Sequence, residues 1–158
     1  MIRPARPGDV PALGDLMAAS PLLVRYRATY DDALVSLRDG LDSGDVLLVS
    51  GEPPHGFAWL TFAPRMLNGA AYLRLLLVAE PAIGAGLGTA LLHAAEATAR
   101  ERANHLYLLC TTDNTAARRF YERHGYVLAG RLPDFTAPGL DEVLYCKALR
   151  DRADRLPG

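Results

Sequence analysis

The chain has 158 residues, of which 50% are hydrophobic and 22% are charged, and its formal net charge is −1. This length suits one domain with a substantial core, and the composition excludes a wholly disordered chain. The basic residues are scattered without a long run, which argues against nucleic acid as a partner. We expect a single domain over residues 1–158, with a polar tail from about residue 150.

The chain is expected to be cytoplasmic and to have no membrane partner. It has no window that approaches the roughly 20 apolar residues of a membrane span, and Met1–Pro7 lacks the apolar stretch of a secretion signal. Cys110 and Cys146 lie in apolar, strand-like segments, where thiols usually pack as small hydrophobic groups. We therefore expect free thiols, and no spacing of histidine and cysteine predicts a metal site.

The first half of the chain predicts a short strand, two helices and three strands. Asp9 can cap a helix that runs to about Ala19, because apolar residues follow it at helical spacing. A second helix is expected from Asp31 to Leu41. The three strands, joined by glycine-containing turns that include the hairpin dipeptide Asn68-Gly69, are expected over residues 46–49, 57–62 and 70–78.

The third of these strands ends in the apolar run Leu75–Val78, which predicts a central strand whose far end is buried on both faces. A long helix ending near Ala103 and a strand over residues 106–111 follow, and this strand–helix–strand crossover makes the two strands parallel neighbours. A helix from Asn114 and strands over residues 126–131 and 143–147 complete the chain. The sequence thus predicts an α/β fold with a mixed, mostly antiparallel sheet flanked by helices.

The segment Ile83-Gly84-Ala85-Gly86-Leu87-Gly88-Thr89 joins the central strand to the long helix. Unpaired N–H groups at a helix start attract phosphate oxygens, and glycines let the backbone come close to them. A plain tight turn is the alternative. A Rossmann dinucleotide site is also considered, because Gly84 and Gly86 fit its first two glycines, but Thr89 occupies the third position. A nucleoside-triphosphate loop would need a nearby lysine, and Lys147 is the only one.

A second motif, Asn114-Thr115-Ala116-Ala117-Arg118-Arg119-Phe120-Tyr121-Glu122-Arg123-His124-Gly125-Tyr126, follows the next strand. Together with the glycine segment it resembles the GNAT superfamily of N-acetyltransferases. That family's glycine motif reads Arg/Gln-x-x-Gly-x-Gly/Ala, and its second motif reads Asn-x-x-Ala-x-x-Phe-Tyr-x-x-x-Gly-Phe/Tyr. Ile83 departs from the first pattern, where arginine or glutamine is usual. The specific motifs lie between Leu75 and Tyr126, and elsewhere only the order of elements matches.

The resemblance implies acetyl-coenzyme A as cofactor and direct transfer of its acetyl group to an amine, without a covalent enzyme intermediate. It implies strand-like pairing of the main chain near Leu77 with the pantetheine arm, and a pyrophosphate site at the glycine segment. Tyr121 is the implied general acid near the thioester sulfur, and core packing is the alternative role for its ring. The cofactor-binding residues expected on this basis are Leu76, Leu77, Val78, Ile83, Gly84, Ala85, Gly86, Leu87, Gly88, Thr89, Asn114, Ala117 and Tyr121.

The group that removes the acceptor's proton is less evident. The central strand and the strand before Asn114 contain no carboxylate, and Leu109 stands where ribosomal-protein N-terminal acetyltransferases carry glutamate. Proton removal through water is therefore favoured. Weaker candidates, for each of which a solvated surface carboxylate is the alternative reading, are Glu80, Asp134, Asp141 and Glu142.

The acceptor is expected to be a small-molecule or peptide amine, and the sequence leaves open whether the chain forms a homodimer. A non-catalytic, acyl-coenzyme A-responsive binding module is the main alternative function, and a dinucleotide-binding oxidoreductase is less favoured. By resemblance, acceptor binding falls to the connection after the first helix and to a late loop. The residues at those places are Arg25, Tyr26, Tyr30, Asp134 and Phe135.

Overall fold

A computed structural model describes residues 1–151, so most of the expected polar tail lies outside the described residues. The chain forms two compact units. The first comprises Met1–Thr61 and Arg74–Thr98, and the second comprises Phe62–Leu73 and the chain from Ala99 onward. Among the described residues, no helix is long and apolar enough to cross a membrane.

The order of elements expected from the sequence is confirmed, with three added helices. Two are short 3₁₀ helices, η1 and η2, and the third is the α-helix α2, which begins at Pro21. Proline suits the first position of a helix, because the N–H that it lacks would have no helical partner there. The elements are β1 (Ile2–Pro4), η1 (Pro7–Asp9), α1 (Val10–Ala19), α2 (Pro21–Arg25), α3 (Tyr30–Asp42), β2 (Val46–Ser50), β3 (Gly56–Ala63), β4 (Ala70–Val78), η2 (Glu80–Ala82), α4 (Leu87–Arg100), β5 (His105–Thr111), α5 (Thr115–Arg123), β6 (Val127–Ala137) and β7 (Leu140–Ala148).

The seven strands follow the order β1-β2-β3-β4-β5-β7-β6 in one mixed sheet. Strands β4 and β5 pair in parallel, as the crossover predicts. The pairs β1–β2, β2–β3, β5–β7 and β6–β7 are antiparallel. The expected α/β fold with a mixed, mostly antiparallel sheet is therefore confirmed.

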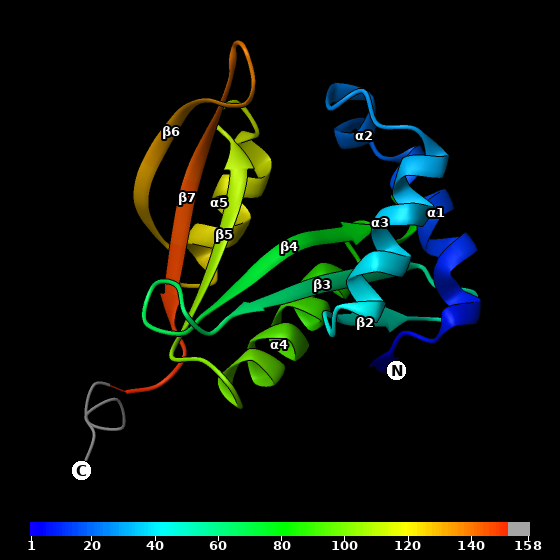
Figure 1. Cartoon of the computed structure of the whole chain (residues 1–158), viewed down its shortest axis with the longest axis horizontal. Helices are drawn as coiled ribbons and strands as arrows, with labels where there is room; N and C mark the ends of the chain where they lie inside the picture. Colours follow the sequence, from blue (N-terminus) through cyan, green and yellow to red (C-terminus); the bar gives the residue numbers. More distant parts are fainter. Residues whose placement is uncertain (152–158) are drawn as a thin grey trace. The chain divides into compact units, whose positions relative to one another are not determined.

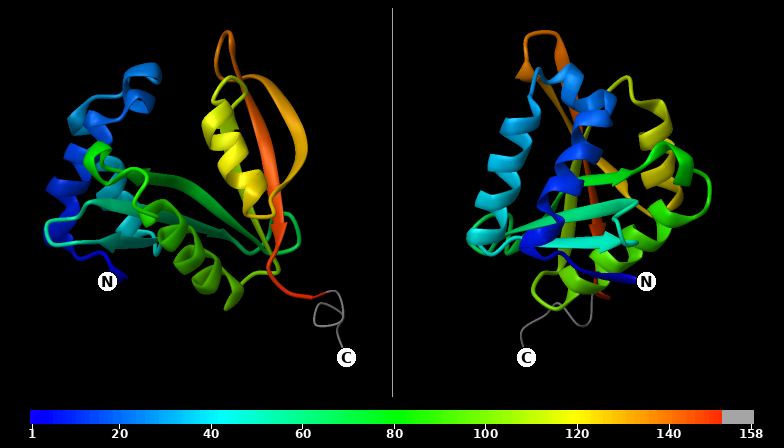
Figure 2. Two further views of the ribbon diagram at one scale, coloured as in Figure 1. Left: turned by 180° about the vertical axis from the view of Figure 1, so that it is seen from behind. Right: turned by 90° about the vertical axis from the view of Figure 1, so that its right-hand side faces the viewer.

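In the first unit, α1 and α3 lie on one face of the strands and α4 lies on the opposite face (Figures 1 and 2). Leu13 of α1 and Leu37 of α3 are fully buried in a cluster with Phe57 and Trp59 of β3. The indole N–H of Trp59 donates to the Asp45 carboxylate at 2.7 Å, which satisfies the polar atom of a buried ring. This core supports β4 and the segment that follows it.

In the second unit, α5 packs beside β5, β7 and β6 (Figure 1). Leu108 of β5 lies opposite Tyr145 of β7, and both side chains are buried. The Arg102 guanidinium lies 3.7 Å from the centre of the Phe62 ring, a cation–π contact. Strand β6 forms the edge of the sheet next to β7.

The prediction that the far end of the central strand is buried on both faces is wrong. The buried half of β4 is its beginning, at Ala70 and Ala71, whereas Arg74 is exposed and Leu75–Val78 are half-buried. The register of β4 with β5 covers Ala71–Leu73, so the apolar run follows the residues in that register. Leu75 and Leu77 still pack against the core of the first unit.

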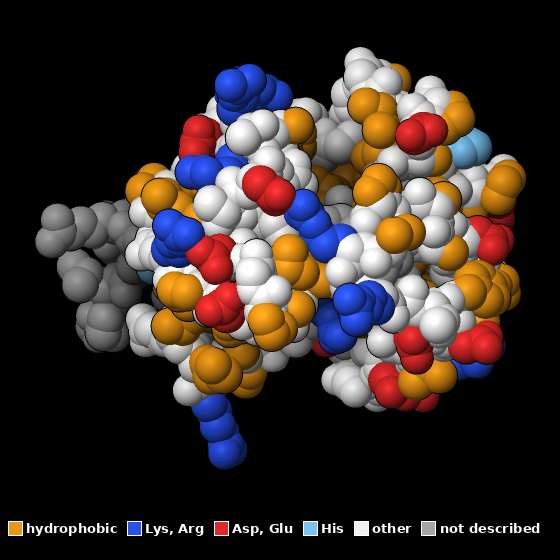
Figure 3. Space-filling view, turned by 90° about the horizontal axis from the view of Figure 1, so that it is seen from above, with side chains coloured by type: hydrophobic (Ala, Val, Ile, Leu, Met, Phe, Trp, Pro, Cys, Tyr) orange, Lys and Arg blue, Asp and Glu red, His pale blue; other side chains and the backbone are white. Residues whose placement is uncertain are grey.

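Acidic and basic side chains are interspersed on the face drawn in Figure 3, where neither sign of charge gathers in one patch. Both cysteines are free thiols, with Cys110 buried and Cys146 half-buried. Burial raises the pKa of Cys110 to about 11, and the nearby Glu142 carboxylate adds to this shift. The Cys110 thiol is therefore protonated at neutral pH and makes a poor nucleophile.

Candidate functional site

The glycine-rich segment follows β4 in the first unit and is fixed at its start. The Ala79 N–H donates to the His55 carbonyl at 2.8 Å, and the Ile83 N–H donates to the Glu80 carbonyl at 3.1 Å. Gly84 and Gly86 have φ values of +86° and +80°, which side chains rarely adopt. A Cβ added at either glycine would meet no heavy atom within 4 Å, so this stretch of backbone faces open space.

The N–H groups of this segment fit a phosphate group. The first helical bond of α4 runs from the Ala90 N–H to the Gly86 carbonyl at 3.0 Å. In the part of the chain that the structure describes, the N–H groups just before this bond have no protein acceptor. The positive end of the dipole of α4, a helix of 14 residues, adds to their attraction for anions. The N–H groups concerned are those of Gly84, Gly86, Leu87, Gly88 and Thr89.

The end of β4 lies directly before this cradle of N–H groups. Leu76, Leu77 and Val78 are half-buried, and a Cβ added to Gly56 would come within 2.8 Å of the Leu77 carbonyl oxygen. Glycine at position 56 therefore lets β3 approach β4 closely. The register of β4 with β5 runs over Ala71–Leu73, before this half-buried stretch begins.

In the second unit, Asn114 caps α5. Its side-chain oxygen accepts a hydrogen bond from the Ala117 N–H at 3.2 Å, and its own N–H donates to the Thr111 carbonyl at 3.0 Å. These bonds fix the turn between β5 and α5. They leave the side-chain NH₂ group of Asn114 to contact a ligand. Cofactor binding by Asn114 and Ala117 stays a prediction.

Tyr121 lies in α5 with 9% of its surface exposed. Its ring makes edge-to-face contacts with Phe120 and Tyr126, at centroid distances of 5.3 and 5.6 Å. Burial raises the pKa of Tyr121 well above its usual value, with smaller effects from Cys110 and Tyr72. The phenol therefore keeps its proton at neutral pH.

The hydroxyl of Tyr121 has no hydrogen-bond partner among the described residues. In the described chain, only Thr61 has a fully buried side-chain N or O atom without a partner. The Tyr121 hydroxyl therefore keeps some contact with solvent. Tyr121 combines a packed ring with an available O–H donor, so the packing role and the acid role are compatible.

A polar network behind Tyr121 ties α5 to the sheet. The Arg118 side chain donates to the Thr112 carbonyl at 3.0 Å and to the Tyr145 hydroxyl at 3.2 Å. That hydroxyl in turn donates to the Glu122 carboxylate at 2.7 Å. This network was not predicted from the sequence, although Arg118 and Glu122 stand four residues apart on one helix face, a spacing that favours such contacts.

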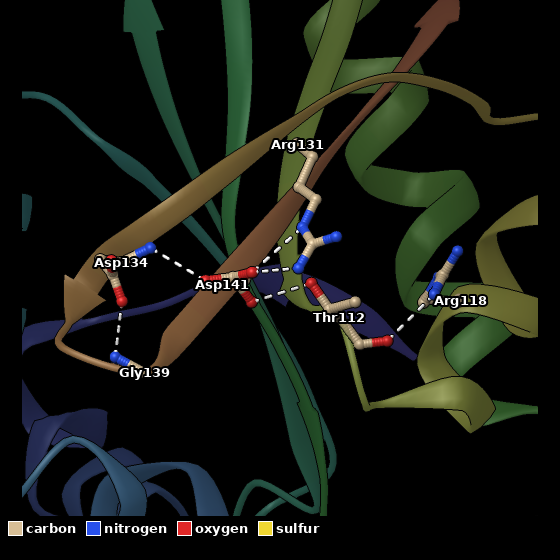
Figure 4. A network of polar contacts seen from close by, with 6 residues as sticks. All are labelled: Thr112, Arg118, Arg131, Asp134, Gly139 and Asp141. Carbon is tan, nitrogen blue, oxygen red and sulfur yellow. Dashed lines mark hydrogen bonds and ion pairs between the residues drawn. The ribbon is translucent and has the colours of Figure 1, made fainter.

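The end of the β6–β7 hairpin holds a second network (Figure 4). The Asp134 N–H donates to the Asp141 carboxylate at 3.0 Å, and the Gly139 N–H donates to the Asp134 carboxylate at 2.6 Å. Arg131 donates to Asp141 through Nε at 3.0 Å and also pairs with it through a terminal nitrogen. The Asp134 N–H and Arg131 lower the pKa of Asp141, which makes that carboxylate a weak base.

The structure distributes the expected acceptor-binding residues over both units. Arg25 ends α2, Tyr26 follows it, and Tyr30 is the first residue of α3; both tyrosines are partly exposed. Asp134 and Phe135 lie in the β6–β7 hairpin, where Phe135 is exposed. No contact described above depends on a substrate, so acceptor binding by these residues stays a prediction.

Of the weaker proton-acceptor candidates, Glu80 is exposed in the first unit, whereas Glu142 is only 2% exposed. The Thr136 hydroxyl donates to the Glu142 carboxylate at 3.3 Å. No pattern in the sequence singles out Thr136, because its role depends on the register of the hairpin.

Comparison with known proteins identifies the family. The model of the Acetyltransferase (GNAT) family matches residues 18–126, more than half of the chain. The chain belongs to the GNAT acetyltransferase family. The matched range contains both the N–H cradle after β4 and the α5 motif, so the resemblance seen in the sequence is confirmed.

GNAT proteins of known structure share the fold at low sequence identity. The ribosomal-protein-alanine N-acetyltransferase from Brucella melitensis aligns with a TM-score of 0.77 and 22% identity, covering 94% of this chain and 99% of its own. An aminoglycoside 6′-N-acetyltransferase complexed with coenzyme A aligns with a TM-score of 0.79 and 17% identity, covering 96% of this chain and 98% of its own. At such identities these two structures show the fold alone.

One acetyltransferase is more similar to this chain in sequence than these two structures. The blasticidin-S acetyltransferase of Streptomyces morookaense is 41% identical over 78 residues, which cover 49% of this chain and 57% of that enzyme. The match therefore spans little more than half of the relative's length.

Proposed function

We propose that this GNAT protein is an acetyl-coenzyme A-dependent N-acetyltransferase that acts on a primary amine of a small molecule or peptide. The observation that carries the proposal is the row of N–H groups without protein acceptors between Gly84 and Thr89, at the start of α4. Such a row suits a pyrophosphate. Membership in the family supports coenzyme A over the dinucleotide of an oxidoreductase.

Acetyl-coenzyme A supplies a reactive thioester and a thiolate leaving group when it is bound. In the proposal, the N–H groups from Gly84 to Thr89 hold the pyrophosphate, and the main chain of residues 76–78 pairs with the pantetheine amides as an added strand would. The exposed Ile83 side chain adds no charge to this site. Phosphate binding therefore depends on the backbone.

Tyr121 is the proposed proton donor to the departing thiolate. Its raised pKa keeps the hydroxyl protonated, and that hydroxyl has no competing partner among the described residues. The acceptor must reach the thioester as a neutral amine, so a second group has to take a proton from it. Cys110 is unsuited to covalent catalysis, because its thiol is buried and protonated, which supports direct transfer.

The acceptor class is the finer part of the proposal. The relative with 41% identity is named for blasticidin S, which makes that antibiotic the first acceptor to test. An aminoglycoside and a short peptide with N-terminal alanine represent the acceptors named for two structural neighbours. A cytoplasmic location stays a prediction from the sequence, and a homodimer stays an open alternative.

Two experiments test the proposal in order. Calorimetry with acetyl-coenzyme A, coenzyme A and a nicotinamide dinucleotide decides the cofactor class, and binding of the dinucleotide alone would contradict it. Release of the coenzyme A thiol is then measured with blasticidin S, the aminoglycoside and the alanine peptide. Thiol release that requires one of these amines is the expected result.

A non-catalytic, acyl-coenzyme A-responsive module is the second candidate function. It is favoured by Ile83 at a position usually held by arginine or glutamine, and by the lack of a carboxylate on β4 and β5. This module would bind acetyl-coenzyme A in calorimetry without releasing thiol in the presence of any of the three amines.

A further inference from the structure

A buried carboxylate lies behind an exposed hydroxyl at the β6–β7 hairpin. Glu142 of β7 is 2% exposed, and its Oε1 atom accepts a hydrogen bond at 3.3 Å from the hydroxyl of Thr136, an exposed residue of β6. Burial of a carboxylate is costly unless hydrogen bonds compensate for the lost water. Thr136 thus connects a buried proton acceptor to the surface of the second unit.

The pair lies on the face of the sheet opposite α5. Tyr145 of β7 contacts Arg118 and Glu122 of α5, so its side chain points to the α5 face. Side chains alternate along a strand, and Glu142 is three residues before Tyr145, so it points to the other face. Thr111 of β5 lies opposite Glu142 in the register and shares that face. Glu142 and Thr111 therefore lie on a face of the sheet that α5 does not cover.

The neighbouring carboxylates of the hairpin are engaged in holding its shape. Asp141 accepts hydrogen bonds from Arg131 and from the Asp134 N–H, which lower its pKa. Asp134 accepts the Gly139 N–H at 2.6 Å, a bond that closes the loop just beyond Thr136. The lowered pKa makes Asp141 a poor proton acceptor. The bonds of both residues fix the strand that carries the Thr136 hydroxyl.

Other titratable groups surround the pair. The Cys110 thiol on β5 interacts electrostatically with Glu142, and Arg118 and Glu122 of α5 act on the same thiol. On the hairpin, Arg131 and Asp141 form an ion pair, so their charges largely offset each other. Since Cys110 keeps its proton at neutral pH, its thiol does not compete with Glu142 as a proton acceptor.

We propose that Thr136 and Glu142 form a relay that removes the proton from the acceptor ammonium, an inference that rests on the proposed acetyl transfer. The nitrogen–hydrogen bond of the ammonium breaks and its proton joins the Thr136 oxygen, while the Thr136 hydroxyl proton moves to Glu142. The products are a neutral amine, an unchanged threonine and a protonated Glu142, which later releases its proton to water. Thr136 contacts the acceptor, and Glu142 acts through Thr136.

The test compares Thr136→Val, Thr136→Ser and Glu142→Gln with the wild type, using whichever of the three amines releases thiol. Valine has the shape of threonine without the hydroxyl, and serine keeps the hydroxyl. At neutral pH, Thr136→Val and Glu142→Gln should lower kcat by about 10²-fold, the low end for general base catalysis. KM and acetyl-coenzyme A affinity should change by a few-fold at most, and Thr136→Ser should stay close to the wild type.

The pH dependence separates proton removal from a structural role. As pH rises, more of the acceptor arrives already neutral, so the defect of Thr136→Val and Glu142→Gln should shrink. Thr112→Val is the matched control, because it removes a hydrogen bond of 3.1 Å from the turn after β5 to the Asp141 carbonyl, and this bond does not involve the Glu142 side chain. Its kcat should stay close to the wild type at every pH, even where its melting temperature falls.

Failure of the proposed acetyl transfer and failure of the Thr136–Glu142 relay give different results. A wild-type protein that releases no thiol with any of the three amines would overturn the proposed transfer and the relay with it. Two results would overturn the relay alone when the wild type turns over. One is an equal kcat for Thr136→Ser and Thr136→Val, and the other is a defect of Thr136→Val and Glu142→Gln that does not vary with pH. Where Glu142→Gln fails to fold, the comparison of valine with serine at the exposed position 136 decides the outcome.

Discussion

The Asp134 carboxylate accepts a hydrogen bond from the Gly139 N–H at 2.6 Å and so closes the β6–β7 hairpin across the loop that joins the two strands. Asp134 itself has a φ of +48°, which aspartate and asparagine adopt more readily than most residues. The same residue was expected from the sequence to bind the acceptor. Its bond to Gly139 gives it a structural role that can be measured separately.

Asp134→Ala should lower the free energy of unfolding by about 1 kcal/mol, because it removes one acceptor and places alanine at a positive φ. Asp134→Asn keeps an acceptor oxygen and tolerates the same backbone, so it should cost clearly less. Urea denaturation of the three proteins measures the difference. An unchanged unfolding midpoint for Asp134→Ala, combined with a raised KM for the amine, would instead assign Asp134 to acceptor binding.

Local signals in the sequence predicted the order of elements well. Asn68 and Gly69 both adopt positive φ values, as the hairpin dipeptide predicts. The apolar periodicity of α1 and α4 located both helices, although α4 ends at Arg100 rather than near Ala103. These features depend on neighbours in the chain, which a sequence displays directly.

Features that depend on pairing between distant residues were not predicted. Strand β6 runs to Ala137, well beyond the expected end at Arg131. This extension was not predicted, because the added residues include polar side chains and Pro133 and do not form an apolar run. Glutamate is usually a surface residue, so the burial of Glu142 was not predicted. Its burial follows from its position opposite Thr111 and beside Thr136. The burial of β4 was misjudged because apolar composition alone does not show where strand pairing ends.

The ion pair between Arg3 and Asp9 should make stability depend on pH in the acidic range. The hydrogen bond from Arg3, at 2.7 Å, is the main cause that lowers the pKa of Asp9 from 3.8 to about 2. A lowered carboxyl pKa stabilises the fold above the unfolded value, and this contribution is lost as pH falls from about 4 to about 2. Asp9→Asn should therefore cost about 1 kcal/mol at pH 7 and almost nothing at pH 2. The free energy of unfolding of the wild type and Asp9→Asn is measured at several pH values, with the exposed Asp15→Asn as control. A difference between wild type and Asp9→Asn that does not vary with pH would contradict the prediction.

Gly86→Asp should weaken acetyl-coenzyme A binding more than it weakens the fold. An added Cβ at this position meets no atom within 4 Å, but the φ of +80° makes any side chain costly, by about 1–2 kcal/mol. Gly86→Ala carries the same backbone cost without the charge and serves as control. Calorimetry should show a much larger loss of affinity for aspartate than for alanine, because its carboxylate repels the phosphates. Equal affinities in the two variants would remove the pyrophosphate from this segment.

Ile83→Arg should tighten coenzyme A binding. The Ile83 side chain is 67% exposed, so replacing it sacrifices little packing. An exposed charge pair contributes roughly 0.2–1 kcal/mol, which corresponds to at most about fivefold in affinity. The gain should disappear in high salt, where exposed charges are screened. Ile83→Met, which lengthens the side chain without a charge, is the matched control, and a gain equal to that of arginine would exclude a phosphate contact.

Tyr121→Phe removes one hydroxyl and keeps the ring that packs against Phe120 and Tyr126. If Tyr121 donates the proton to the thiolate, kcat should fall by about 10²-fold or less, because water partly replaces a lost donor. Acetyl-coenzyme A affinity should change little. The raised pKa of Tyr121 also predicts that its deprotonation causes no loss of wild-type turnover between pH 7 and about 10.

The matched control for this prediction is Tyr126→Phe, which removes a hydroxyl from the neighbouring ring, 5.6 Å away between centroids. Turnover and affinity are measured for both variants from neutral to alkaline pH, with melting temperatures as the check on folding. Tyr126→Phe should keep its kcat even where it loses stability, since its hydroxyl has no part in the transfer. A kcat for Tyr121→Phe equal to that of the wild type, with the fold intact, would reduce Tyr121 to its packing role. The proton for the departing thiolate would then have to come from water, because the buried Cys110 thiol holds its own proton too tightly to supply it.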